Sequence, residues 1–90
     1  MIILKQRPDD FADYKTMPDF AVTENGARET AISNYIRLMV QDGQTNFCVP
    51  LCHITTVVNN AAIIEEKGYK VFAISKGDLE SSHEFLFKKI

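Results

Sequence analysis

Two cysteines and two histidines are the residues of this chain best suited to metal binding or nucleophilic catalysis. Cys48, Cys52 and His53 lie in one short segment, and His83 lies near the C-terminus. Thiolate and imidazole are the ligands that zinc takes in tetrahedral sites. If the segment is extended, the two cysteines lie about 13 Å apart at ~3.3 Å per residue, too far for one metal ion or a disulfide bond. Pro50 disfavours the helix that would bring the thiols closer, so we expect two buried thiols and no metal site.

The same residues do not form a recognisable catalytic centre. A nucleophilic cysteine needs a base within hydrogen-bonding reach and a third group that orients the base. Cys52 and His53 are sequence neighbours, and neighbouring residues of a strand point to opposite faces of a sheet. The glycines are isolated from one another, so the chain has no glycine-rich loop that could hold a phosphate. The sequence therefore predicts a non-enzymatic protein with no catalytic residue and no cofactor.

The segment from Arg7 to Phe20 mixes four aspartates with three aromatic residues and a methionine, the last four spaced at intervals of three. Aromatic residues and methionine are favoured at the centres of protein interfaces, and flanking charges steer the encounter. This segment is therefore a candidate docking surface for another protein. Its predicted contact residues are Asp10, Phe11, Asp13 and Tyr14. The alternative is a short helix, opened by Pro8 and ended by Pro18, whose aromatic side chains cover the open side of a sheet.

A second candidate binding surface consists of Tyr35, Arg37 and Met39. In a strand, these alternating residues share one face. Tyrosine and arginine are frequent anchors of protein interfaces. The alternative is that another part of the chain, or a second subunit, covers this face.

Composition and charge argue against nucleic-acid and membrane partners. The 90 residues, expected to form a single domain over 1–90, contain ten Lys and Arg and twelve Asp and Glu, for a net charge of -2. Nucleic-acid-binding domains usually have a basic excess. The longest stretch without a charged residue, 44–64, contains a proline, a histidine and several amides and hydroxyls, so it is too polar to span a bilayer. With no secretory signal and only two cysteines, we expect a cytoplasmic protein.

A helix followed by a strand is the clearest local pattern. Over 54–67, apolar residues recur at i, i+3, i+4, i+7 and i+10, which predicts a helix with one buried face. Gly68 follows, at a position where helices commonly end in a left-handed residue. The next segment, 69–75, has apolar residues on both parities, as in an interior strand covered on two sides. We expect Asn59 and Asn60 to lie on the solvent side of the helix.

The stretch 27–41 fits two structures. Asp42-Gly43 is a common two-residue hairpin turn, and the register that it sets pairs apolar residues of 27–41 and 45–51 on one face. We therefore favour a hairpin. The alternative is a helix over 27–41 closed by Gly43, because the same apolar residues also have helical spacing. β-branched and aromatic residues favour the strand, whereas the residues that begin the stretch favour the helix.

Two more strands complete the predicted sheet. Residues 2–6 form a short apolar strand, and 84–90 form either a final strand paired with 69–75 or the end of a helix begun near Asp78. The predicted fold is α+β, a mostly antiparallel four-to-six-stranded sheet with one main helix (about 54–67) packed on one face.

The sequence thus predicts a small non-enzymatic protein that acts by occupying another protein, as an inhibitor, regulator or assembly subunit. A chain this short has a thin core, and an interface between identical subunits would add burial, so we expect a homo-oligomer. One alternative is a homo-oligomeric binder of a small ligand or nucleotide that uses Tyr35, Arg37 or the two adjacent asparagines. A nucleic-acid-binding domain is the second alternative, supported by the lysines in the last third of the chain.

Overall fold

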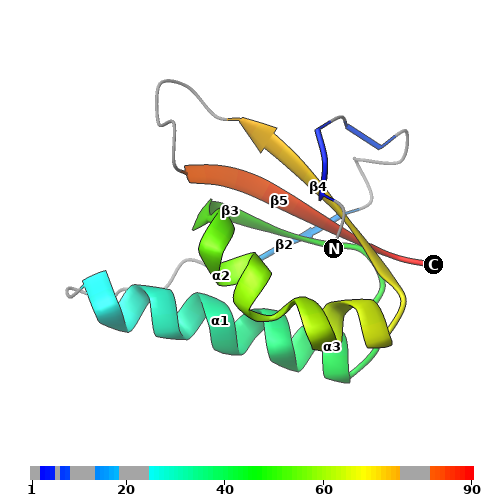
Figure 1. The fold of residues 1–90 in the computed structure, drawn as a ribbon, viewed down its shortest axis with the longest axis horizontal. Helices are drawn as coiled ribbons and strands as arrows, with labels where there is room; N and C mark the ends of the chain where they lie inside the picture. Colours follow the sequence, from blue (N-terminus) through cyan, green and yellow to red (C-terminus); the bar gives the residue numbers. More distant parts are fainter. Residues whose placement is uncertain (1–2, 6, 9–13, 19–24, 76–81) are drawn as a thin grey trace.

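A five-stranded sheet packs one of its faces against three helices in the computed structural model, which describes residues 3–5, 7–8, 14–18, 25–75 and 82–90 (Figure 1). The strands are β1 (Ile3–Leu4), β2 (Lys15–Thr16), β3 (Phe47–His53), β4 (Tyr69–Ser75) and β5 (Ser82–Lys89). Their order across the sheet is β1-β4-β5-β3-β2. β5 is antiparallel to both of its neighbours, whereas the short edge strands β1 and β2 are parallel to theirs. The predicted α+β class and mostly antiparallel sheet are confirmed.

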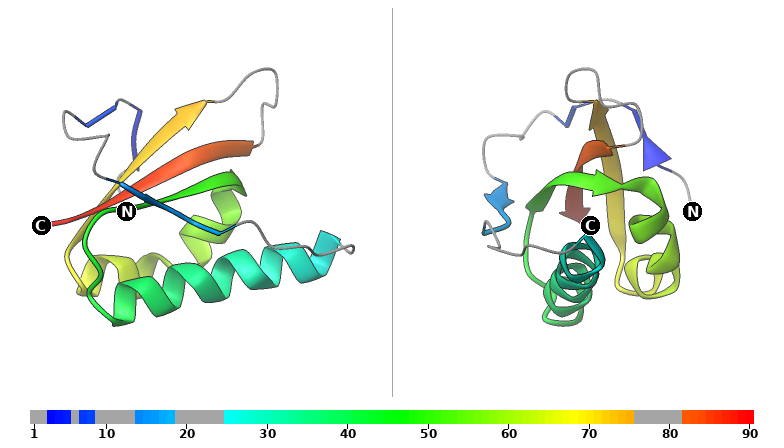
Figure 2. Two further views of the ribbon diagram at one scale, coloured as in Figure 1. Left: turned by 180° about the vertical axis from the view of Figure 1, so that it is seen from behind. Right: turned by 90° about the vertical axis from the view of Figure 1, so that its left-hand side faces the viewer.

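The helices are α1 (Asn25–Gln41), α2 (Ile54–Asn59) and α3 (Ala61–Glu66). Figure 2 shows all three on the same side of the sheet, with α1 lying beside α2 and α3. The predicted strand 69–75 is confirmed, and of the two interpretations of 84–90 the strand is correct, because β5 pairs along the whole of β4. The predicted strand over 2–6 corresponds to β1.

The predicted hairpin of 27–41 with 45–51 is wrong, because 27–41 belongs to α1. The glycine of the supposed hairpin turn ends this helix instead: Gly43 has a φ of 65°. Its N–H donates to the carbonyl of Val40, and the N–H of Gln44 donates to the carbonyl of Met39. These two bonds are the pattern of a Schellman motif, which satisfies carbonyls that the end of a helix leaves unpaired. An aspartate-glycine pair suits this end as well as a hairpin, so it could not distinguish the two structures.

The predicted main helix over 54–67 is also corrected, since the chain there forms two short helices, α2 and α3, and α1 is the main helix. The break is at Asn60, whose φ of -108° and ψ of 13° are not helical. Its side-chain Nδ2 donates to the Thr56 carbonyl at 2.8 Å and to Ser33 Oγ of α1 at 3.1 Å. Asparagine side chains compete in this way with the regular helical hydrogen bonds. Asn60 is therefore buried, contrary to the prediction, whereas Asn59 is exposed as predicted.

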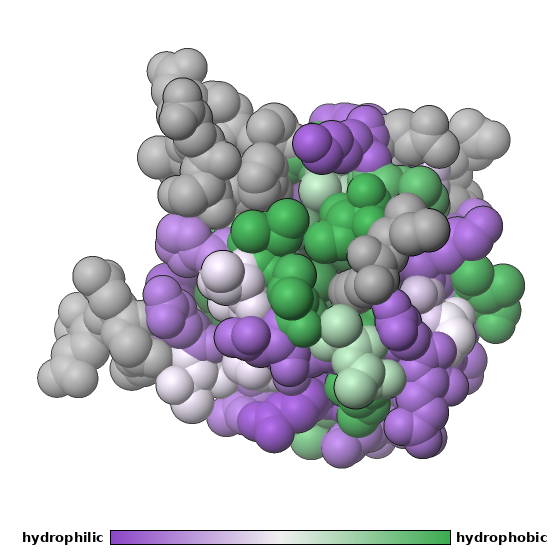
Figure 3. Space-filling model, in the orientation of Figure 1, coloured by the Kyte–Doolittle hydropathy of each residue, from purple (hydrophilic) through white to green (hydrophobic). Residues whose placement is uncertain are grey.

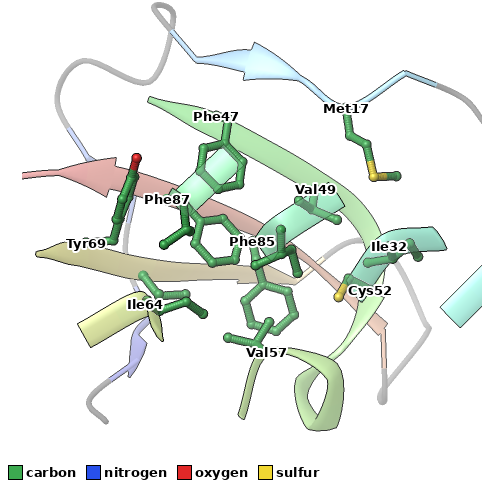
Figure 4. Packing of buried hydrophobic residues seen from close by; sticks show 13 residues of the cluster. Met17, Ile32, Phe47, Val49, Cys52, Val57, Ile64, Tyr69, Phe85 and Phe87 are labelled. Atoms are coloured by element: carbon green, nitrogen blue, oxygen red, sulfur yellow. The ribbon is translucent and has the colours of Figure 1, made fainter. Parts of the chain in front are cut away.

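The main core lies between the sheet and the helices. Figure 4 shows Phe47, Phe85 and Phe87 of the sheet pointing toward Val57 and Ile64 of α2 and α3. The Phe47 and Phe87 rings are stacked, with centroids 4.6 Å apart. These large apolar residues are fully buried, so they fix how α1, α2 and α3 sit on the sheet.

An irregularity in β3 separates the two cysteines. Leu51 has a φ of 51°, and the pairing with β5 shifts between Val49 and Cys52. Such a β-bulge reverses the side-chain alternation that follows it. Cys52 therefore belongs to the main core, whereas Cys48 packs in a second cluster around Phe72 and Leu86. The predicted burial of both thiols is confirmed, and they form no disulfide bond.

Candidate functional site

The first predicted docking surface is only partly within the described structure. Asp10, Phe11 and Asp13 lie outside the described residues. Tyr14 is half-buried and packs against the second cluster, that of Cys48. The suggested helix ending at Pro18 is wrong in its last part, because Lys15–Thr16 form β2. Tyr14 thus covers apolar surface, as the alternative interpretation of this segment expected of its aromatic residues.

The second predicted surface is divided by the helical conformation. In α1, residues two positions apart are about 200° apart around the axis, so Tyr35 and Met39 lie on a different side from Arg37. Tyr35 is half-buried and forms a T-shaped ring pair with Phe47, 6.0 Å between centroids, and burial, together with Cys48, raises the pKa of Tyr35. Met39 packs against the main core. Arg37 is exposed, so only this member of the predicted set is available to a partner.

A polar groove separates α1 from α2 and includes Arg37. It encloses about 220 Å³. The residues that line it are Glu29, Thr30, Ser33, Asn34 and Arg37 of α1, and Thr56 and Asn59 of α2. The α1 residues repeat at three- and four-residue intervals, so the helix gathers them on one flank. These residues share one side of the chain only in a helix, so the strand interpretation of 27–41 could not predict the groove.

Hydrogen bonds hold the walls of this groove in place. The amide of Asn60 joins Ser33 on α1 to the Thr56 carbonyl on α2, so the two helices are connected at the groove. On the α1 side, Arg37 Nη2 donates to Asn34 Oδ1 at 2.6 Å. This bond orients the guanidinium along the exposed side of the helix. The sequence reasoning missed the role of Asn60, and its signal would have been an asparagine at the middle of an otherwise amphipathic helix.

Two further hollows extend the groove at both ends. Beside the N-terminal part of α1, a hollow of about 230 Å³ shares Glu29 and Thr56 with the groove and adds Leu51 and His53. Along the outer side of α1, a third hollow of about 300 Å³ shares Arg37 with it. We call the three together the α1–α2 surface, and its residues beyond the groove are Arg28, Ile32, Leu38, Gln41, Leu51 and His53.

Exposed leucines lie toward the two ends of the α1–α2 surface. Leu38 is 61% exposed and Leu51 is 48% exposed. Polar side chains surround each of these leucines. Protein interfaces have a similar arrangement, with an apolar centre and a polar rim. Ile54 and Val58 give α2 an exposed apolar side that faces away from the groove residues Thr56 and Asn59. Figure 3 shows mostly hydrophilic side chains along α1 at the bottom of the molecule and hydrophobic ones gathered near its centre.

The ionisable groups of the α1–α2 surface are predominantly basic. Among the described residues that line it, Arg28 and Arg37 are cationic and Glu29 is the single acidic residue. The chain as a whole has a net charge of -2. The charge of this surface is therefore positive, opposite in sign to the net charge of the chain, and the surface can attract anionic groups.

The thiol nearest this surface is held in a buried, protonated state. Cys52 is completely buried, and its Sγ donates to the His53 carbonyl at 3.4 Å. Burial raises the pKa of this thiol to about 12, outweighing the opposite effects of Arg28 and of a hydrogen bond with Thr56. A protonated thiol reacts poorly, because the thiolate is the nucleophilic form. His53 is exposed while Cys52 is buried, so the two do not face a common substrate position.

Metal ligands do not gather in the part of the chain that the structure describes: no three His, Cys, Asp or Glu side chains lie close enough together to hold an ion. Among the same described residues, no helix has both the length and the apolar character needed to cross a membrane.

A comparison of the chain with protein-family models, curated proteins and solved structures finds no match.

Proposed function

We propose that this protein acts by occupying another protein through the α1–α2 surface, without catalysing a reaction. The observation that carries this proposal is the continuity of three hollows along α1, with Arg37 shared by two of them and exposed leucines toward the ends. Arginine and well-placed apolar residues are the usual anchors of such interfaces. The protonated state of the Cys52 thiol also argues against a cysteine enzyme.

The size of the surface favours a transient partner. With 17 residues, α1 is about 25 Å long at 1.5 Å per residue. The six-residue α2 is about 9 Å long, so the two helices, each about 10 Å wide, present roughly 340 Å² in projection, well below the roughly 800 Å² per partner of a standard stable interface. A regulatory or inhibitory contact is consistent with that area, and the buried thiols are consistent with the reduced cytoplasm as its location.

A small-molecule ligand is less well supported. Typical ligand sites enclose roughly 300 to 1,000 Å³ and are largely apolar. The hollows here enclose about 220, 230 and 300 Å³, and the central one is lined by polar residues throughout. A protein partner can use all three hollows together, whereas a nucleotide would depend on one of them.

Site-specific photo-crosslinking tests the proposal. Asn34 is exposed at the centre of the α1–α2 surface and would be replaced by p-benzoylphenylalanine in the cells from which the gene comes. We expect one dominant crosslinked protein from this position and none from the same replacement at Lys70, which is exposed on β4. Equal, heterogeneous products from both positions would refute a specific surface.

The same experiment addresses self-association. If a homo-oligomer forms through this surface, the exposed Leu38 and Leu51 are the apolar side chains whose burial would stabilise it. A crosslinked product of twice the 10.2 kDa chain mass from Asn34 would mean that a second copy occupies the α1–α2 surface. That result would replace the different-protein proposal by a homo-oligomer.

A further inference from the structure

We propose that Leu51 is the apolar anchor of the α1–α2 surface, and that the partner fills the hollow beside it with an uncharged apolar side chain. This inference rests on the proposed function and adds the residue that binds and the chemistry that it selects. It is carried by a β-bulge that turns Leu51 outward, by the left-handed backbone of this residue and by its exposed place in the wall of the hollow.

The β-bulge removes Leu51 from the core side of the sheet. The pairing of β3 with β5 advances three residues on β3, from Val49 to Cys52, while β5 advances two. Val49 belongs to the main core, and in a regular strand the residue two positions later, Leu51, would share its face. Because of the extra residue, Cys52 takes this place in the core and Leu51 is 48% exposed.

This arrangement costs the folded protein stability. Burial of a leucine stabilises a fold more than burial of the smaller cysteine, because the stabilisation grows with the apolar area removed from water. The backbone adds a second cost, since Leu51 has a φ of 51°, in the left-handed region that is unfavourable for most residues with a Cβ. Glycine and asparagine adopt this conformation more readily. Strained residues cluster at functional sites, and a contact of the exposed side chain with a partner accounts for a leucine here.

The hollow beside Leu51 selects what the partner presents. It encloses about 230 Å³, below the roughly 300 Å³ of the smallest usual ligand sites, so it suits one side chain better than a whole ligand. Ile32 of the main core lines it together with Leu51. Among the described residues of its lining, the full charges are one of each sign, on Arg28 and Glu29. A charged group would gain little from this balanced pair and would lose hydration, whereas an apolar side chain gains contact with both aliphatic residues.

Protection of the sheet edge does not account for a leucine at this position. β2 pairs with β3 only at Phe47 and Cys48, so among the described strands the later part of β3 lies at an edge. Bulges and prolines prevent further strands from pairing with such an edge. Pro50 and the bulge give this protection whatever side chain follows, and glycine or asparagine would give it without strain. The apolar side chain of Leu51 therefore needs another explanation, which binding supplies.

Variants of Leu51 separate a binding role from a structural one, because the two roles predict opposite changes. Leu51→Gly and Leu51→Asn remove the apolar side chain and relieve the left-handed strain. We expect the urea midpoint of each to equal or exceed that of the parent protein, while the yield of the Asn34 crosslink falls about tenfold. Leu51→Met keeps an apolar side chain and should keep the crosslink. Ile90→Ala, at another exposed apolar residue, is the control and should change neither measurement.

A nuclear magnetic resonance titration tests the chemistry of the hollow without the partner. The probe is N-acetylleucine amide, and the control is N-acetylaspartic acid amide, in which a carboxylate replaces the isopropyl group. We expect the probe to cause saturable shifts of the methyl signals of Leu51 and Ile32 but not of Ile90, with an affinity about tenfold higher than that of the control. Equal affinity for the two compounds, or no saturable shift at Leu51, would overturn the inference.

The crosslinking results distinguish failure of this inference from failure of the proposed function. A crosslink from Asn34 that survives in Leu51→Asn would show that the α1–α2 surface binds without Leu51 as its anchor. A parent protein that gives no specific crosslink would refute the proposed function itself. Lower urea midpoints in both Leu51→Gly and Leu51→Asn would show a structural role for the leucine and would overturn the inference. A product of twice the 10.2 kDa chain mass would replace the different protein by a second copy as the occupant.

Discussion

Two neighbouring rows of residues on α1 have the same four-residue spacing but different surroundings. The core-facing row consists of Ile32, Ile36 and Val40, which are all buried. The groove-facing row consists of Glu29, Ser33 and Arg37, which line the groove beside α2. Both rows repeat every four residues along one helix, so local conformation cannot explain the difference. The comparison shows that α1 packs into the core with one flank and lines the groove with the other.

Adjacent substitutions in the two rows should have very different effects on stability. Ile36→Ala removes a completely buried side chain and should lower the free energy of unfolding by about 3 kcal/mol through lost burial and the cavity left behind. Arg37→Ala, at the next position but exposed, should change it by less than about 0.5 kcal/mol. Urea denaturation followed by circular dichroism measures both. Similar losses in the two variants would contradict the division of labour on α1.

The connection between the rows and α2 depends on Asn60. Asn60→Ala removes the side-chain bonds to Ser33 Oγ and the Thr56 carbonyl and should destabilise the protein by about 2 kcal/mol. Asn59→Ala is the matched control, because this neighbouring amide is exposed, and its effect should be within about 0.5 kcal/mol. Denaturant midpoints of the two variants measure the difference. If Asn59→Ala were the more damaging change, the groove would not be held by Asn60.

The smallest expected effect is a loss of stability in alkali caused by Cys52. Its pKa is about 12 in the folded protein, against 9.0 for an ordinary cysteine. Above pH 9 the unfolded chain loses this proton before the folded protein does, so unfolding becomes easier as the pH rises toward 12. The slope is at most about 1.4 kcal/mol per pH unit for one group.

Unfolding free energies measured between pH 8 and pH 10 test that slope. Cys52→Ala should lower the stability at pH 8 and should flatten the dependence on pH above 9. Tyr35 and Tyr69 also have pKa values raised by burial, so they add to the loss only above the ordinary tyrosine value of 10.0. An unchanged slope in Cys52→Ala would show that another group causes the alkaline loss.

The candidate site was less predictable than the sheet because one stretch of chain satisfies two periodicities. Tyr35, Arg37 and Met39 share a face in a strand, but in α1 Arg37 turns away from the other two. Of the three, Arg37 is the exposed one, as a candidate surface anchor must be. The two-residue period of a strand grouped Arg37 with Tyr35 and Met39, which are half-buried. It did not group Arg37 with Ser33 and Asn34, which line the groove.

Local sequence determined the α+β class, the strand β4 and the burial of both thiols, and it marked Gly43 as the residue of a turn or of a helix end. Each of these features depends on how apolar residues alternate along a segment, or on a residue that favours a special backbone conformation. Both signals lie within a few neighbouring residues of the chain. Only the tertiary structure decided that 27–41 is a helix, that Asn60 divides α2 from α3, and that Arg28 and Arg37 border one surface. The physical reason is that these features depend on which distant residues cover an apolar row or accept a buried hydrogen bond.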